Sequence, residues 1–300
     1  MGRRTVRHEP VVHLPAVIAP PRPPEIVGTH SLEIDEGHVV IASDCHYRSD
    51  EPASTAHRAL VELTSRFAED GTLRALILNG DVEDFPKISK HARIGWEHQP
   101  SVAEELAIFR HRMSEIASIA GLDTELVMTM GNHDVRLDTF LSQNAPAFEG
   151  VMGFSLRDHI DPSWAISWQV EINGCDPASV LVKHRHRSGA SATKANVLAA
   201  GRSIVTGHSH QPGITRISHG ARHLYGVDAG CIAALNSRAF VGYTEMAAAS
   251  GLANWASGFA VLTFKDGLLL PPELVLVVDE EAGLAAFRGE LINVNARALH

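Results

Sequence analysis

The chain contains little cysteine and no long hydrophobic run. Its three cysteines, Cys45, Cys175 and Cys231, are too few and too widely spaced to form a disulfide framework. A reducing compartment is the simplest explanation of such cysteine use, and it predicts a cytoplasmic protein. The longest apolar runs are far shorter than the roughly 20 residues that cross a bilayer, so we expect no membrane-spanning helix and no membrane partner. We also find no internal repeat of solenoid length.

Basic residues are in the minority. The 26 lysines and arginines are outnumbered by 35 aspartates and glutamates, which gives a formal net charge of −9. Proteins that bind polyanions non-specifically are usually basic, so this charge makes nucleic acid the less favoured partner. Hydrophobic residues make up 45% of the 300 positions, enough for the core of one large α/β domain or two small ones.

Proline sets the domain boundary that the sequence predicts near the N-terminus. Six prolines between Pro10 and Pro24 interrupt this part of the chain. Proline resists regular structure and favours extended conformations. We therefore expect residues 1–30 to form an arm or a disordered tail, residues 31–285 to form the folded domain, and residues 286–300 to form a C-terminal surface strand or tail. Docking of the arm on a neighbouring subunit is an alternative that leaves the oligomeric state open.

Helical periodicity and helix-start signals predict two long helices in the first half of the chain. Apolar residues at helical spacing follow Pro52, and we expect the first helix to open at residues 50–52. Ser101 and Glu104 form a capping-box pattern before the second helix, which Gly121 is expected to end. Alternating hydrophobicity over residues 166–172 predicts a single strand.

One pattern recurs five times: a short apolar run ends in side chains that can bind a metal ion. Apolar runs of this length indicate buried strands. Polar side chains directly after a buried strand indicate a functional site, because they contribute little to core packing. The fivefold recurrence of this pattern is stronger evidence than any single motif. The five ends are Asp44-Cys45-His46, Gly80-Asp81, Gly131-Asn132-His133-Asp134, Lys183-His184 and Gly207-His208-Ser209-His210.

The spacing inside these motifs supports metal binding. Residues two apart in an extended chain point to the same side, so Asp44 and His46 can hold one cation while the residue between them faces away. His208 and His210 have the same spacing. A carboxylate such as that of Asp81 can bridge two cations about 3.5–4 Å apart. Nitrogen and oxygen ligands without a thiolate suit Mn, Fe or Zn.

In order, the motifs D-x-H, G-D-x-x-D, G-N-H-D, an isolated histidine and G-H-x-H resemble those of the calcineurin-like metallophosphoesterases. The resemblance spans roughly residues 38–265, and residues 80–89 are also similar to the phage-type and bacterial branch of that family. It implies an α/β fold in which two mixed sheets are flanked by helices in a four-layer sandwich. It also implies that every ligand lies at the carboxyl end of a strand.

The resemblance implies seven ligands for two divalent cations. His184 stands directly at its strand end, and His186 is the alternative, because Arg185 occupies a place where the family commonly has glycine. Asn132 is neutral, so it donates an oxygen without adding charge. The expected set is Asp44, His46 and His210 on one cation, Asn132, His184 and His208 on the other, and Asp81 between them.

The activity implied by the resemblance is hydrolysis of a phosphomonoester or phosphodiester by a hydroxide that bridges the two cations. His133 is expected to protonate the leaving oxygen and Asp84 to hold its ring. A cap on a helix or turn is the alternative role for Asp84. Arg136 and His186 are the candidate substrate-binding side chains, and for Arg136 a surface salt bridge is an equal alternative. No residues with the pattern of a Ser or Cys nucleophile and its base are recognised.

Two other functions are alternatives to a phosphoesterase that acts on a small or nucleotide-like substrate. A metal-dependent nuclease uses the same chemistry but is disfavoured by the acidic net charge. A non-catalytic binding or scaffold module could reuse the same fold, and the intact ligand set argues against it. The ligands do not name the substrate, because specificity resides in the surrounding loops.

Overall fold

The computed structural model describes residues 24–91, 95–96, 98–174, 179–189, 191–220, 222–237, 240–241 and 255–295. Cys175 and most of the expected N-terminal arm lie outside these residues. The helices and strands are β1 (Ile26–Val27), β2 (His30–Leu32), β3 (Gly37–Ala42), α1 (Thr55–Glu69), β4 (Leu73–Asn79), η1 (Pro86–Ile88), α2 (Val102–Ala120), β5 (Glu125–Thr129), α3 (Arg136–Asn144), η2 (Pro146–Phe148), η3 (Leu156–His159), β6 (Trp164–Ser167), β7 (Val170–Ile172), β8 (Val180–Val182), α4 (Ala192–Ala200), β9 (Ser203–Thr206), β10 (Gly213–His219), β11 (Arg222–Asp228), β12 (Gly258–Lys265), β13 (Leu268–Leu269), β14 (Glu273–Asp279), β15 (Leu284–Phe287) and β16 (Glu290–Asn293).

These strands form two mixed sheets. The larger has the order β1-β6-β5-β4-β3-β12-β14-β15-β16, with β13 paired to β12. Strands β1, β6, β5, β4 and β3 run parallel, whereas β12 to β16 pair antiparallel. The smaller sheet has the order β10-β11-β9-β8-β7-β2, and β8, β9 and β11 run parallel. The carboxyl ends of β3, β4 and β5 therefore meet at one edge, as do those of β8 and β9.

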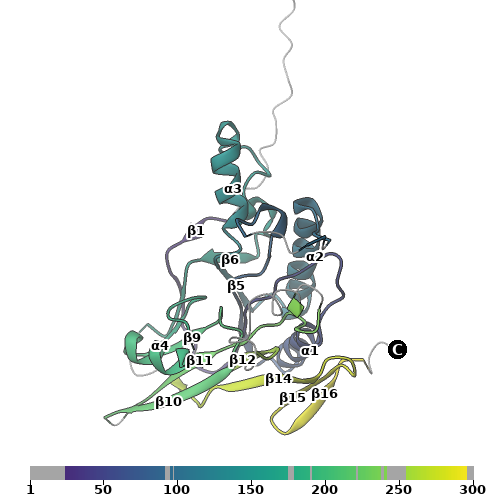
Figure 1. Ribbon diagram of the computed structural model, residues 1–300. Coiled ribbons are helices and arrows are strands. Elements are labelled where there is room, and N and C mark those ends of the chain that lie inside the picture. The colour runs from purple at the N-terminus through teal and green to yellow at the C-terminus, as the bar shows by residue number, and fades with distance from the viewer. Residues whose placement is uncertain are drawn as a thin grey trace, which may run out of the picture.

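The apolar strands are buried on both faces, and this produces the layers. Val40 and Leu76 point from the larger sheet toward α1 and α2, whereas their neighbours Ile41 and Ile77 point toward the smaller sheet. A third cluster, which includes Val197, packs α4 on the outer face of the smaller sheet. Helix, sheet, sheet and helix thus form four layers (Figure 1), and the fold expected from the sequence is confirmed.

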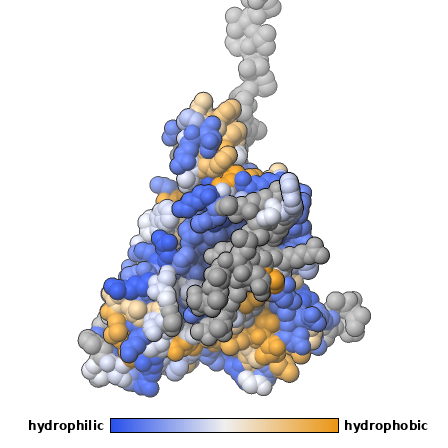
Figure 2. All heavy atoms as spheres, in the orientation of Figure 1, coloured by the Kyte–Doolittle hydropathy of each residue, from blue (hydrophilic) through white to orange (hydrophobic). Residues whose placement is uncertain are grey.

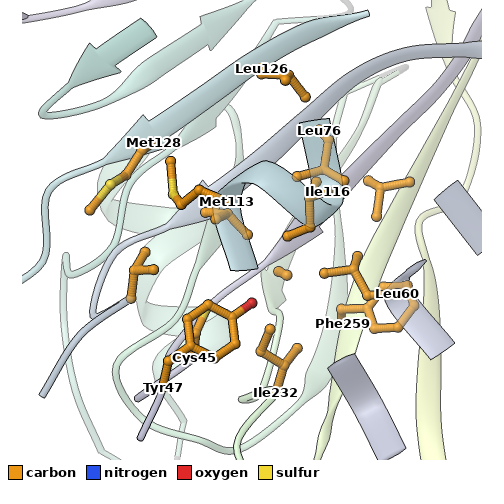
Figure 3. Close-up of a cluster of buried hydrophobic side chains, with 14 of the residues drawn as sticks. Cys45, Tyr47, Leu60, Leu76, Met113, Ile116, Leu126, Met128, Ile232 and Phe259 are labelled. Atoms are coloured by element: carbon orange, nitrogen blue, oxygen red, sulfur yellow. The ribbon is translucent and has the colours of Figure 1, made fainter. Parts of the chain in front are cut away.

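The two long helices cover the larger sheet. Ser54 caps α1 by accepting a hydrogen bond from the His57 N–H, so the helix begins later than residues 50–52, where we expected it. The predicted capping box at Ser101 and Glu104 opens α2, which ends before Gly121. Figure 3 shows the resulting core, in which Ile116 lies beside Leu76 and Met113 extends toward Met128.

Sheet pairing extends beyond both ends of residues 31–285. Ile26 and Val27 pair with β6 and His30 begins β2, so sheet structure begins within the segment expected to be an arm. At the other end, β16 pairs with β15 beyond residue 285. The single strand expected over residues 166–172 is instead two: β6 belongs to the larger sheet and β7 to the smaller. The chain crosses between the sheets at Trp168 and Gln169. Within the described residues, no helix is both long and apolar enough to cross a bilayer.

The packing of α2 gives a test of the fold. Phe109 is 0% exposed in the cluster between α2 and the larger sheet. Phe109→Ala removes the ring and leaves a cavity, so we expect the free energy of unfolding to fall by about 3–5 kcal/mol. Urea-induced unfolding followed by circular dichroism measures the change. Leu122→Ala, at a fully exposed position just beyond the helix, is the control and should change it by less than about 0.5 kcal/mol. Equal losses would contradict this packing.

Candidate metal centre

The carboxyl ends of five strands converge where the two sheets meet. Asp44 follows β3 and Asp81 follows β4 in the larger sheet, whereas His184 follows β8 in the smaller. Glycine allows this close approach: a Cβ on Gly80 would lie 2.5 Å from Cγ of His184, and one on Gly207 would overlap Ser43 and Asp44. The backbone of each glycine therefore packs directly against polar side chains carried by the other sheet.

Several candidate ligands adopt left-handed backbone conformations. The φ angles are 53° at Asp44, 44° at His46 and 51° at Asp81, and they are 69° at His208 and 55° at His210. Non-glycine residues rarely adopt positive φ, and such residues concentrate at functional sites. The extended-chain argument for the two-residue spacing is therefore wrong, although Asp44 and His46 do share one cluster, whereas His208 and His210 belong to different ones. Left-handed residues follow β3, β4 and β9 and direct these side chains into the site.

The first cluster contains Asp44, His46 and His210, whose candidate ligand atoms lie within 4.8 Å of one another. The Nε2 atom of His210 is 3.0 Å from Oδ1 of Asp44, and the His46 Nε2 is 3.9 Å from the same oxygen. Burial opposes ionisation of Asp44, but the imidazoles of His210 and His184 outweigh it and hold the pKa of this carboxyl well below its usual range. Nε2 of His46 and Nδ1 of His210 are buried and have no hydrogen-bond partner.

The second cluster contains Asp81, His184 and His208, again within 4.8 Å. Nε2 of His184 is 3.1 Å from Oδ2 of Asp81, and Nδ1 is 2.8 Å from the Asn79 carbonyl oxygen. Since a carbonyl only accepts, Nδ1 carries a proton and Nε2 faces the cluster, as in metal-ligating histidines. Burial opposes protonation of His184, yet Asp44 and Asp81 raise its pKa to about 10. A cation binding here would displace that proton.

Asn132 and His186 are exposed and belong to neither of the two clusters. Asn132 occupies the turn after β5 and its side chain is exposed. The turn is held beside the cluster, because the N–H of His133 donates to Oδ1 of Asp81 at 2.8 Å. His186 is also exposed and belongs to neither cluster, whereas His184 is buried in one of them.

The candidate acid–base residues form a compact group beside the clusters. Nδ1 of His133 is 2.6 Å from Oδ1 of Asp84, and Nη2 of Arg136 is 3.0 Å from Nε2 of His133. A guanidinium only donates, so Nε2 accepts and the ring proton is on Nδ1, where it is donated to Asp84. Arg136 also donates to the Asp84 carbonyl oxygen. Arg136 thus occupies the nitrogen of His133 that was expected to act on the leaving group.

Asp84 lies close to both His46 and His133, and the three form a further group within 4.8 Å. Burial opposes the ionisation of Asp84, but hydrogen bonds from His133 and His46 hold its pKa well below the usual range. Asp84 is therefore an anion that anchors two imidazoles. It contacts His133 through its side chain rather than capping a helix.

Sequence reasoning missed the role of Asp134. This fully buried carboxylate accepts hydrogen bonds from the backbone N–H groups of Asp81, Val82 and Gly131 at 2.8, 2.9 and 2.7 Å. It thereby joins the loop after β4 to the loop after β5. Burial, and then the charge of Asp81, raise its pKa to about 6 despite these donors. The sequence feature that could have identified Asp134 is its place as the last residue of the motif Gly131-Asn132-His133-Asp134.

Asp228 was also missed, although it directly ends the apolar strand β11. Its Oδ2 accepts from the Ser209 hydroxyl at 2.6 Å and its Oδ1 from the Gly230 N–H at 2.9 Å. Ser209 separates two candidate ligands, so Asp228 fixes the loop that carries them. The strand-end pattern applied to the other sites would have identified it.

Aromatic rings cover the first cluster. The ring of Trp255 lies 4.4 Å from that of His210, and the ring of Phe240 lies 5.6 Å from that of His46. The residue before Trp255 lies outside the described residues. These rings form an apolar wall against two candidate ligands.

Two connected cavities lie beside the clusters. The larger, of about 1150 Å³, is lined by Arg48, Trp96 and Ser237 among others, and no candidate ligand lines it. The smaller, of about 30 Å³, shares Arg48 with it and reaches His46. These cavities place open space for a substrate group next to the first cluster.

No protein-family model matches this sequence, and no curated protein matches it. Among solved structures, zinc-bound Vps29 from Entamoeba histolytica is similar at 12% identity and a TM-score of 0.44, over 86% of this chain and 99% of that one. A dimetal phosphatase from Danio rerio is similar at 9% identity and a TM-score of 0.37, over 81% of this chain and 96% of that one. Nuclease MPE from Pseudomonas putida is similar at 13% identity and a TM-score of 0.32, over 79% of this chain and 84% of that one. Similarity at this level assigns no activity to this chain.

The placement of His184 and His186 gives a test of metal binding. His184 is buried against Asp81, whereas His186 is exposed. His184→Ala should therefore lose one of the two expected cations, and His186→Ala should keep both. Elemental analysis by mass spectrometry after dialysis against excess Mn measures the content. Loss of metal from the His186 variant alone would reverse the assignment.

Proposed function

We propose that this protein is a binuclear metal-dependent phosphoesterase that hydrolyses phosphomonoesters or phosphodiesters. The observation that carries the proposal is the pair of buried Asp/His clusters at the meeting edges of the two sheets. Three ring nitrogens in these clusters, on His46, His184 and His210, are buried without a hydrogen-bond partner. Buried polar atoms are nearly always partnered, so Nε2 of His46 and Nε2 of His184 fit cation ligands, and His210 turns its Nε2 toward Asp44.

The donor set fits two divalent cations of the Mn, Fe or Zn type. Asp44, His46 and His210 would hold one, and His184 and His208 would hold the other with Asn132, with Asp81 between them. Nitrogen and oxygen donors without a thiolate favour these metals. When bound, such a pair activates water as the nucleophile and neutralises charge on the phosphoryl oxygens.

His133 supplies the proton for the leaving oxygen in this proposal. Its Nδ1 is fixed by Asp84, and its Nε2 contacts Arg136. A phosphate that enters the site competes for the Arg136 guanidinium, because charge-assisted bonds to phosphate are strong. Arg136 then binds substrate, and Nε2 of His133 is free to take a proton and donate it to the leaving oxygen.

The arrangement of His133, Asp84 and Arg136 favours an enzyme over a binding or scaffold module. A module that only binds metal has no need of an oriented imidazole beside the ligands. The nuclease alternative uses the same residues and differs only in the size of the substrate. The free, buried state of Cys45 and Cys231 fits the proposed cytoplasmic location.

Exchange of His133 separates catalysis from metal binding. His133→Ala should leave the metal content unchanged and lower turnover by about 10²–10⁴-fold, the usual scale of general acid catalysis. The loss should be largest for alkyl phosphate esters and smaller for p-nitrophenyl esters, since p-nitrophenolate leaves without a proton. Asp84→Asn should show a weaker version of the same pattern. Initial rates with both classes of ester measure it, with His159→Ala as an unaffected control. Loss of a cation from the His133 variant would reassign this residue to the metal ligands.

Metal removal tests the proposed hydrolysis itself. Dialysis against a chelator should abolish hydrolysis of p-nitrophenyl phosphate and of bis-p-nitrophenyl phosphate, and Mn, Fe or Zn should restore at least one of these activities. Asp81→Asn should be the most damaging ligand change, because it weakens both cations. Full turnover by the chelated protein would contradict the mechanism.

A further inference from the structure

The segment of residues 183–187, Lys-His-Arg-His-Arg, is the most basic part of the chain beside the metal centre. We call it the basic segment. It carries three permanent positive charges in five positions, in a protein whose formal net charge is −9. Arg185, His186 and Arg187 are exposed, whereas His184 is a buried member of the second cluster. The segment therefore begins inside the metal centre and continues onto the surface at its rim.

Several other arginines of this protein are paired with carboxylates, and others bond to uncharged groups, as Arg74 does to the Glu36 carbonyl oxygen and Arg110 to His159. Arg48 contacts Asp50 at 3.0 Å, and Arg112 contacts Glu115 at 2.9 Å. Arg66, Arg202 and Arg288 pair with glutamates in the same way. By contrast, no carboxylate of the described residues forms an ion pair with any of the three cations of the basic segment. An acidic protein that leaves these cations unpaired keeps them available to an external anion.

The backbone of the basic segment is fixed at both ends. The N–H of Lys183 donates to the Val205 carbonyl oxygen at 3.0 Å. The N–H of Arg187 donates to Oδ1 of Asn196 at 2.9 Å, and Asn196 is itself buried and bonded to Thr206. Anchoring to β9 and α4 fixes the backbone that carries these side chains relative to the second cluster, and a fixed backbone lowers the entropic cost of binding an anion.

Geometry places the basic segment next to the site. His184, one of its five residues, lies 3.1 Å from Oδ2 of Asp81 through its Nε2. The ring centroid of His184 is also 5.3 Å from that of His208. The exposed cations therefore follow directly on a member of the second cluster. Hydrophilic side chains also cover the part of the surface below α3 that is visible in Figure 2.

We infer that the basic segment is a second phosphate-binding subsite, and that the natural substrate carries at least one phosphate beyond the one that is hydrolysed. This inference rests on the proposed phosphoesterase function and narrows its substrate class. The chemistry recognised is a phosphate oxygen bound by Arg185 and Arg187, with Lys183 adding charge. The second phosphate belongs to a polyphosphorylated small molecule, such as a nucleotide, or to the next phosphodiester of a nucleic acid strand. Local charge of this kind attracts a polyanion even when the net charge of the protein is negative.

Binding to the metal-free protein tests the subsite without turnover. The probes are inorganic tripolyphosphate, measured by calorimetry at an ionic strength of about 0.1 M, and a fluorescent oligothymidylate of about eight nucleotides, measured by anisotropy. Arg185→Gln/Arg187→Gln should weaken binding of at least one probe by about tenfold or more. For the oligonucleotide, the slope of log affinity against log salt concentration should also become shallower by about one for each phosphate that the variant no longer neutralises.

A matched control removes the same charge elsewhere. Arg66 lies in the last turn of α1 and Arg74 near the amino end of β4, at the edge of the sheet opposite the metal centre. Arg66→Gln/Arg74→Gln should leave binding of both probes within about twofold of wild type, because surface charges beyond about 10 Å are screened. Equal weakening by both double variants would overturn the inference, since net charge alone would then explain it. Failure of both probes to bind wild-type protein, or unchanged binding by the Arg185/Arg187 variant, would also overturn it.

Kinetics of the metal-loaded protein distinguish this inference from the proposed function. The p-nitrophenyl ester of thymidine 5′-phosphate is compared with the same ester carrying a 3′-phosphate. Wild type should prefer the second by about tenfold in kcat/KM, and Arg185→Gln/Arg187→Gln should lose that preference.

Hydrolysis without any preference for the ester with the 3′-phosphate would refute only the inference. Binding through the basic segment without hydrolysis of any ester would refute only the phosphoesterase. If kcat/KM keeps rising as the oligothymidylate substrate becomes longer, the second phosphate belongs to a nucleic acid strand. If kcat/KM rises no further beyond two phosphates, the second phosphate belongs to a nucleotide.

Discussion

The candidate site depends on a close contact between two sheets at one edge. A side chain at Gly80, after β4, would overlap His184 after β8, and a side chain at Gly207, after β9, would overlap Ser43 and Asp44 after β3. This contact brings Asp44 of the larger sheet to 3.0 Å from His210, which belongs to the smaller. Neither sheet alone supplies a complete ligand cluster. The buried apolar faces between the sheets therefore stabilise the fold and also fix the geometry of the site.

Electrostatics explain why such a site requires a cation. Asp44 and Asp81 are buried carboxylates, and a buried charge is costly unless it is paired. Without a metal, the imidazoles provide that pairing, and for this reason the pKa of His184 is raised to about 10. A divalent cation replaces the proton and satisfies ring nitrogens that otherwise lack a partner. Asp134 is also a buried anion and Asp84 a partly buried one, but backbone N–H groups stabilise the first and imidazoles the second, so they organise the loops instead.

Much of the fold could be predicted from the sequence, because buried parallel strands are apolar on both faces and end in conspicuous polar residues. The same logic identified Asp44, Asp81 and His184. It missed Asp134 and Asp228, because their bonds go to backbone groups and a serine that only the folded chain brings near. It attributed the shared direction of Asp44 and His46 to an extended chain, whereas both residues have left-handed backbone conformations. Side-chain alternation along a strand does not predict such conformations beyond its end. The split of residues 166–172 into two strands depends on which sheet each half pairs with, and local sequence does not carry that information.

The central claim is that these clusters hold two cations between the sheets. Anomalous diffraction from crystals grown with Mn measures this directly. We expect two Mn peaks about 3.5–4 Å apart, one beside Asp44, His46 and His210 and the other beside His184 and His208, with Asp81 contacting both. A single peak, or peaks outside the meeting edges of the two sheets, would contradict the account.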